Sequence, residues 1–170
     1  MRATYRAAVY VIPRRGDEIL LFRRFNTGFG DGQYSFIAGH VEQGESVTAT
    51  AIREAMEEAG IGLRVDDLHF GHILHRHSAD GLVYFDFFFV ADRWDGYPAV
   101  MEPHRCDEMV WAPWQDLPAT TLPYIRSVID QIFAQSHPFS EHGWSPSPIA
   151  EIEPNVWVHH ALGPVQLSEE

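Results

Sequence analysis

Apolar residues are spaced along the chain in two ways, and each spacing predicts a different kind of element. Residues 122–134 repeat them at helical spacing, and residues 46–59 are helical in composition and period. Shorter apolar runs bounded by turn residues predict strands. These runs cover residues 7–13, 18–24, 34–38, 68–75, 82–92 and 108–112. One helix among many strands, followed by a late helix, predicts a layered domain of the α/β or α+β class.

Turn-forming residues separate these elements. Residues 14–17 predict a hairpin turn, and Asp-Gly at 80–81 is typical of a turn that needs positive φ angles. Residues 26–33 contain three glycines and predict a loop. After residue 136 the chain holds five of its eleven prolines without a clean period. We therefore expect one domain over residues 1–136 and an acidic, proline-rich tail over residues 137–170, packed on the body or partly disordered.

The composition is that of a soluble globular protein. The chain has 170 residues, enough for one domain that buries roughly 70% of its unfolded surface. It is 45% hydrophobic and 21% charged, and no apolar run reaches the roughly 18 residues of a membrane span. The first residues lack the apolar core of a secretory signal, and a single cysteine, Cys106, excludes an internal disulfide framework. We therefore expect a cytoplasmic protein with no membrane partner.

The charge of the chain limits its partners. Twelve arginines, with no lysine, stand against 24 acidic residues and give a net charge of -12. This charge argues against a nucleic-acid polymer as partner, because binding it depends on cationic neutralisation of phosphates. Residues 1–30 carry six arginines and two acids (+4), whereas residues 39–61 carry five glutamates and one arginine (-4). A basic segment beside an acidic one suits a small phosphorylated substrate with a divalent metal, although scattered surface charge gives the same numbers.

The helix predicted over residues 46–59 carries an acidic face. Ser46 is a fair N-cap and Gly60 a fair C-terminal stop. At about 100° per residue, three glutamates fall on one face of this helix, and small or apolar residues cover the opposite face. The three are Glu54, Glu57 and Glu58. The helix is therefore expected to bury one side and to present three carboxylates together on the other.

Three neighbouring carboxylates repel one another unless a cation lies between them. These three also lie in the C-terminal half of the helix, where the macrodipole disfavours negative charge. Carboxylate oxygens are hard ligands suited to Mg²⁺ or Mn²⁺, and metal binding would offset both costs. For three glutamates taken alone, a solvated acidic face is the simpler alternative.

The wider spacing around this helix resembles a known signature. Every fixed position and both apolar positions match the Nudix box, G-x5-E-x7-R-E-U-x-E-E-x-G-U, in which U is an apolar residue. The matching residues are Gly39, Glu45, Arg53, Glu54, Ala55, Glu57, Glu58, Gly60 and Ile61. Over residues 5–135 the order of strands and loops is also similar to MutT-type Nudix domains. The chain is therefore identified as a member of the Nudix hydrolase superfamily.

The resemblance implies a fold, a cofactor and a set of metal ligands. The fold is the Nudix fold, an α/β/α sandwich around a mixed β-sheet, and the activity is hydrolysis of a nucleoside diphosphate linked to another group, with Mg²⁺ or Mn²⁺. The family's metal ligands correspond here to Glu54, Glu57, Glu58 and the carbonyl of Ala38. Glu45 is then an accessory ligand or orients a water, and Arg53 holds the glutamates by ion pairing.

The implied reaction is attack of water on a phosphorus atom of the phosphoanhydride. Metal ions neutralise the phosphate charge and lower the pKa of the water, and a carboxylate takes its proton. The box does not identify that base, and acids outside it are candidates too: Glu102, Asp107 and Glu108. Glu108 opens a predicted strand at a place where many family members carry a functional acid.

Substrate contacts are expected around the glycine-rich loop. Arg23 and Arg24 end the second strand, and only one of them can face the site because side chains alternate along a strand. The resemblance favours Arg24, and without lysine any side-chain cation on phosphate must be arginine or histidine. Phe36 is one of several aromatic residues that could stack on a base, although aromatic residues near strands more often form core. Gly39 and Glu108 complete the expected contacts.

Three functions stay open. The leading one is a MutT-like pyrophosphohydrolase that converts NTP or dNTP to NMP and pyrophosphate. The second is a pyrophosphatase for ADP-ribose or another nucleotide sugar, and the third is a non-catalytic Nudix nucleotide-binding module. All three take a small nucleotide as ligand. An exposed apolar strand or the tail could also support a homodimer.

Overall fold

The helices and strands of the computed structural model, which describes residues 2–144, begin and end close to the predicted positions. In chain order they are β1 Arg6–Arg15, β2 Glu18–Arg24, β3 Tyr34–Ser35, β4 Ile37–His40, α1 Val47–Ala59, a short 3₁₀ helix Val65–Asp67, β5 Leu68–His77, β6 Val83–Ala91, β7 Cys106–Pro113, α2 Pro123–Phe133 and β8 Phe139–His142. Both predicted helices and all six predicted strand segments are therefore present, one of them as two strands.

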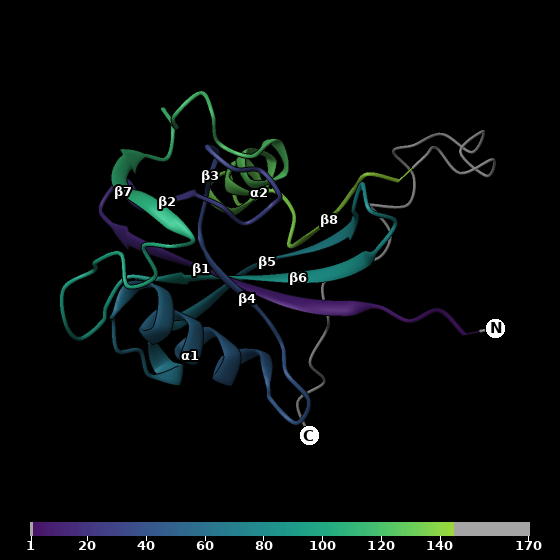
Figure 1. Cartoon of the computed structure of the whole chain (residues 1–170), viewed down its shortest axis with the longest axis horizontal. Helices are drawn as coiled ribbons and strands as arrows, with labels where there is room; N and C mark the ends of the chain where they lie inside the picture. Colours follow the sequence, from purple (N-terminus) through teal and green to yellow (C-terminus); the bar gives the residue numbers. More distant parts are fainter. Residues whose placement is uncertain (1, 145–170) are drawn as a thin grey trace, which may run out of the picture.

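Strand β1 lies at the centre of the sheet (Figure 1). It pairs antiparallel with β4 on one side and parallel with β6 on the other, so that Val9 lies level with Gly39 and with Phe87. Strand β5 then pairs antiparallel with β6. Because it has neighbours on both sides, β1 is buried over most of its length, as its continuous apolar run requires.

Strand β2 belongs to a second group of strands, in which it pairs antiparallel with β3 and with β7. The segment predicted as one strand over residues 34–38 is divided between the two groups. Ser35 in β3 pairs with β2, whereas Ile37 in β4 pairs with β1. The chain crosses between the groups at Phe36, and the sequence pattern does not reveal the crossing because both halves are apolar.

The two helices pack on opposite faces of the sheet (Figure 1). The core under α1 includes Val9, Val11 and Phe89, and the core under α2 includes Tyr10 and Phe88. Neighbouring residues of β1 thus face different helices, as the period of two along a strand requires. A mixed sheet between two helices confirms the predicted α/β/α sandwich. Within residues 2–144, no helix is long and apolar enough to cross a membrane.

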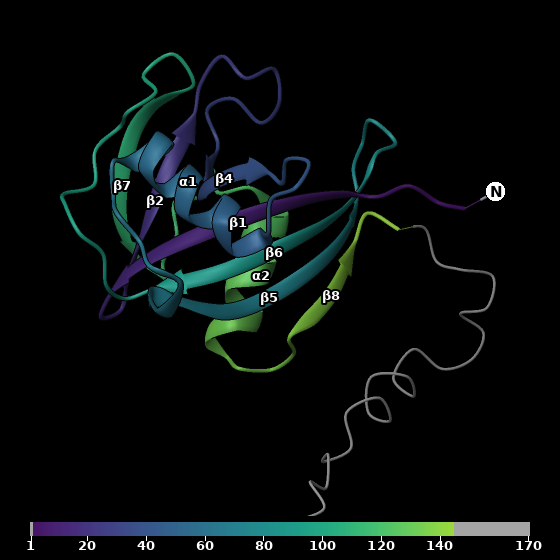
Figure 2. The same cartoon turned by 90° about the horizontal axis from the view of Figure 1, so that it is seen from below.

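The sheet continues beyond residue 136. Strand β8 lies parallel to β5 at the edge of the sheet, with Phe139 level with Ile73 (Figure 2). The predicted tail therefore begins with an edge strand that is part of the sheet. Residues 145–170 lie outside the described residues, and a separate tail over them stays a prediction.

Candidate active site

Helix α1 carries the acidic residues of the box and lies close to β4. Ser46 accepts a hydrogen bond from the Ala49 amide at 3.2 Å, and Gly60 ends the helix with a φ of 66°. Three of its buried residues have only a methyl side chain: Ala51, Ala55 and Ala59. This small face lets the helix approach the strand so closely that a methyl group on Gly39 would overlap the carboxylate of Glu54. The glycine of β4 therefore makes room for Glu54.

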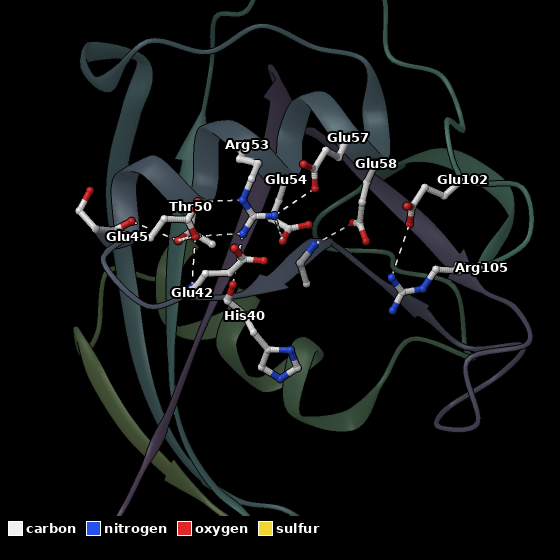
Figure 3. Close-up of polar contacts among 12 residues, drawn as sticks. His40, Glu42, Glu45, Thr50, Arg53, Glu54, Glu57, Glu58, Glu102 and Arg105 are labelled. Carbon is white, nitrogen blue, oxygen red and sulfur yellow. Dashed lines mark hydrogen bonds and ion pairs between the residues drawn. The ribbon is translucent and has the colours of Figure 1, made fainter.

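The guanidinium of Arg53 lies at the centre of the carboxylate array (Figure 3). Its Nε and Nη2 donate to the two oxygens of Glu45 at 2.8 and 3.0 Å. Its Nη1 donates to Glu54 at 2.6 Å and to Glu57 at 3.0 Å. The planar fork of arginine allows one residue to bind all three carboxylates. Arg53 thus has the contacts needed to order the glutamates.

Glu45 is fixed at the start of α1. The Thr50 hydroxyl donates to it at 2.8 Å and the Glu42 amide donates to it at 3.2 Å. The hydrogen bonds from Arg53 and Thr50 lower the pKa of Glu45 from its ordinary value to about 2. A carboxylate this acidic accepts a proton poorly at neutral pH, which favours an orienting role over that of general base.

The other three glutamates differ in their surroundings. Glu58 is partly buried and accepts a hydrogen bond from the Ala38 amide at 2.9 Å. Burial raises the pKa of Glu58 to about 7, and the nearby charges of Glu54 and Glu102 raise it as well. Burial also raises the pKa of Glu54. Glu57 is open to solvent, with 53% of its side chain exposed.

The donor chemistry of this array fits a divalent cation. Glu54, Glu57 and Glu58 offer hard oxygen ligands, and a cation would offset the repulsion and burial that raise the pKa of two of them. In the described part of the chain, no three His, Cys, Asp or Glu side chains already surround one point. Arg53 instead lies between Glu54 and Glu57. Ala38, whose carbonyl is the predicted ligand, contacts the array through its amide.

A cleft of about 540 Å³ lies beside the array, a volume suited to a small ligand. Its lining combines helix α1, the glycine-rich loop and the sheet, and includes Arg24, Phe29, Gly39, His40, Glu54, Arg76, Tyr84, Arg105 and Tyr124. A second hollow of about 590 Å³ lies near His69 and Ile132, away from the carboxylates. We assign the site to the first cleft because Glu54 lines it.

Comparison of the sequence and the fold with those of known proteins identifies the family of this chain. The sequence matches the NUDIX domain over residues 4–133. The chain belongs to the Nudix family. A crystal structure of a MutT NUDIX hydrolase from Burkholderia pseudomallei is similar, with a TM-score of 0.70 and 25% identity over 76% of this chain and 99% of that one. The fold is therefore the Nudix fold.

Curated relatives match shorter segments of this Nudix chain. An NAD-capped RNA hydrolase of Stutzerimonas stutzeri is 45% identical over 56 residues, which are 33% of this chain and 20% of the relative. An oxidized purine nucleoside triphosphate hydrolase of Danio rerio is 35% identical over 79 residues, 46% of this chain and 49% of the relative. The chain thus spans about a fifth to a half of the length of these relatives.

The two arginines at the end of β2 have different neighbours. Arg24 lines the cleft, and its Nε and Nη2 donate to the Phe29 carbonyl at 2.7 Å and to the Thr27 hydroxyl at 3.0 Å. Arg23 pairs with Asp107 at 2.8 Å and with Glu108 at 2.6 Å. Both arginines border a small cavity of about 70 Å³ that Glu58 also lines. Of the two, Arg24 is the one that reaches the main cleft.

Two predicted substrate contacts lie away from the lining of the Nudix cleft. Phe36 is 3% exposed and packs in the core under α2, because the chain crosses between strand groups at this residue. The carboxylate of Glu108 is paired with Arg23. Neither side chain lines the cleft, so neither is placed to contact a ligand there.

Other residues of the cleft gave little or no signal in the sequence. Arg105 lines both the cleft and the small cavity, and it lies 3.7 Å from Glu102. Arg76 lines the cleft from β5 and pairs with Asp86 of β6. Asp86, the buried partner of Arg76, has a visible signal, since an acid in the middle of the apolar run 82–92 requires a buried partner. The sequence pattern alone does not say which residue that partner is.

Proposed function

We propose that this Nudix chain hydrolyses NTP or dNTP to a nucleoside monophosphate and pyrophosphate, with Mg²⁺ or Mn²⁺ as cofactor. One observation carries the proposal: Glu54 of the carboxylate array lines the same cleft of about 540 Å³ as Arg24 and Arg105. Carboxylates suit the metal and arginines suit the phosphates. The Danio rerio relative, an oxidized purine nucleoside triphosphate hydrolase, agrees with this reaction class.

The box residues divide the work of the site. Glu54, Glu57 and Glu58 would hold the cation, with the Ala38 backbone beside Glu58. A bound divalent cation neutralises phosphate charge and lowers the pKa of water. Arg53 keeps the carboxylates ordered through its three ion pairs.

The remaining roles fall to the arginines and to one carboxylate. Arg24 and Arg105 neutralise the phosphates, and the hydrogen bonds that Arg24 makes to the glycine-rich loop hold it in place. A carboxylate of the array accepts the proton of the attacking water. Glu45 suits this step poorly, because the hydrogen bonds from Arg53 and Thr50 lower its pKa to about 2 and make it a weak base.

A substrate panel tests the proposal. The purified full chain is incubated with Mg²⁺ and, separately, NTPs, dNTPs, ADP-ribose or NAD, and pyrophosphate, phosphate and AMP are measured. Release of pyrophosphate from triphosphates supports the proposal. Release of AMP from ADP-ribose or NAD, without turnover of triphosphates, replaces it with the nucleotide-sugar alternative. If no compound is turned over, the binding-module alternative replaces it.

Gly39→Ala should lower turnover strongly with little loss of stability. The added methyl group would overlap the Glu54 carboxylate, which can move away only by leaving the array. We expect kcat to fall by about tenfold to a hundredfold, since displacing a catalytic group by about 1 Å costs this much. Gly62→Ala is the matched control, because its new methyl group would meet its nearest neighbour at an ordinary 3.5 Å. Equal activity of the two variants would contradict the role given to Gly39.

Stabilisation by Mg²⁺ should increase with pH. The pKa of Glu58 is raised from its ordinary 4.5 to about 7 in the folded protein without metal. Between these values the folded state binds more protons than the unfolded state, so the metal-free protein loses stability as the pH rises through this window. The cation binds the deprotonated form and competes with the proton.

Thermal unfolding with and without Mg²⁺ measures this competition. The rise in Tm caused by Mg²⁺ should be larger at about pH 8 than at about pH 6, because Glu58 is mostly ionised only at the higher pH. Glu58→Gln should remove most of this difference. An identical Mg²⁺ effect at both pH values in the native protein would show that Glu58 is not a ligand.

A further inference from the structure

The cleft ends at a buried ion pair that the proposed reaction does not use. Arg76 donates from Nε to Asp86 at 2.5 Å and from Nη2 to the other oxygen of Asp86 at 3.2 Å. The Arg76 side chain is 9% exposed and the Asp86 side chain is not exposed at all. Burying two charges is costly, and one member of the pair, Arg76, lines the cleft while Asp86 is fully buried. A role toward the ligand would explain its position.

One nitrogen of the Arg76 guanidinium is left for that ligand. Asp86 binds Nε and Nη2, and Nη1 has no hydrogen-bond partner among residues 2–144. Because Arg76 lines the cleft, the two N–H groups of Nη1 are the donors that it can offer there. Asp86 itself is fully buried, so it fixes the orientation of the guanidinium without contacting the ligand.

The surroundings of Arg76 suit a flat, uncharged group better than a phosphate. Its guanidinium lies 4.4 Å from the ring centroid of Tyr84 and 4.9 Å from that of Tyr124. Asp86 already neutralises its positive charge. Arg76 therefore lies against two aromatic rings of the cleft, with its own charge already paired.

The phosphates belong at the end of the cleft beside Glu54, which lies against Gly39 of β4. The order of strands separates the two ends: β4, β1, β6 and β5 lie side by side (Figure 1). Three strand spacings of about 4.8 Å place the backbone of β5 roughly 14 Å from that of β4. A nucleotide with its phosphates beside β4 would therefore point its base toward Arg76.

We propose that Arg76 selects bases that carry a keto group at the recognised edge, guanine over adenine and uracil over cytosine. The inference rests on the proposed function, since it assumes a nucleotide in the cleft. A keto oxygen accepts from Nη1, whereas the exocyclic amino group at the same position of adenine or cytosine is itself a donor. An amino base would leave the Arg76 donors facing other donors, away from water.

The test compares matched nucleotides in the native chain and in Arg76→Lys. A lysine can still pair with Asp86, but it does not offer a second, outward-facing nitrogen. For the native chain we expect kcat/KM to be about tenfold or more higher for GTP than for ATP and for UTP than for CTP. Binding of GMP and AMP, measured by calorimetry without metal, should show the same preference. In Arg76→Lys both preferences should shrink to about twofold or less.

Two further variants make the result decisive. Arg6→Gln is the control: Arg6 lies 6.0 Å from the Tyr84 ring centroid on the neighbouring strand but does not line the cleft. It should keep the native preference. If Arg76→Lys does not fold, Arg76→Gln combined with Asp86→Asn retains a hydrogen-bonded, neutral pair and takes its place.

The outcomes separate this inference from the proposed function. A native chain without base preference, or equal losses for keto and amino bases in the Arg76 variant, overturns the inference and leaves the hydrolase intact. A native chain that turns over no nucleotide, yet binds GMP better than AMP through Arg76, overturns the hydrolase and supports the base selection.

Discussion

Replacing Glu58 with glutamine is expected to lower kcat by about two to four orders of magnitude while the protein still folds. Glutamine has nearly the same shape as glutamate, and its carbonyl oxygen can still accept the hydrogen bond from the Ala38 amide. It cannot carry the negative charge that a divalent cation requires. Glu57→Gln should give a similar loss, because Glu57 is a carboxylate of the same array, paired with Arg53. Both are measured as initial rates of pyrophosphate release at saturating Mg²⁺ and substrate.

The control for these two variants is a glutamate that lies outside the array. Glu18 pairs with Arg15 on the surface at 3.0 Å, and Glu18→Gln should keep native turnover. Unfolding curves should show that Glu58→Gln is at least as stable as the native chain without metal, because burial already disfavours the charged form of Glu58. If Glu57→Gln and Glu58→Gln both kept native turnover, the metal site would have to be assigned elsewhere.

The acidic helix could be predicted from the sequence because the signals that define it are local. The N-cap Ser46, the stop at Gly60 and the grouping of glutamates on one face all depend on residues within a few turns. The predicted helix 46–59 accordingly differs from α1 by one residue at its start. The ion pairs of Arg53 with Glu54 and Glu57 follow from the same short spacing, whereas Glu45 lies eight positions before Arg53.

The far end of the cleft could not be predicted, because it depends on pairing between strands. Arg76 meets Asp86 only through the register of β5 against β6, and this register shifts between Phe70 and His72. Such an irregularity changes which side chains face the cleft, and it leaves no mark in the alternation of apolar residues. Phe36 lies in the core for a related reason, because the chain crosses between strand groups at this residue, and the alternation of apolar residues does not mark the crossing.

Asp86→Ala is expected to lower the free energy of unfolding by about 3–5 kcal/mol. The variant leaves the Arg76 guanidinium, only 9% exposed, without its carboxylate partner and too buried to be fully hydrated. Asp92→Ala is the matched control, because Asp92 makes the same two-bond contact with Arg14, at 2.6 and 2.8 Å, on the exposed surface. We expect that control to lose about 1 kcal/mol or less, since water solvates the remaining charge. Urea unfolding monitored by tryptophan fluorescence measures both values.

A double variant separates the cost of an unpaired charge from the net contribution of the pair. Arg76→Met combined with Asp86→Leu removes both charges and fills the space with apolar atoms, and it should recover most of the stability lost in Asp86→Ala. Similar losses in Asp86→Ala and Asp92→Ala would contradict the burial argument. Recovery of stability in the double variant without recovery of base preference would indicate that the pair is retained for recognition, since an apolar replacement serves the fold equally well.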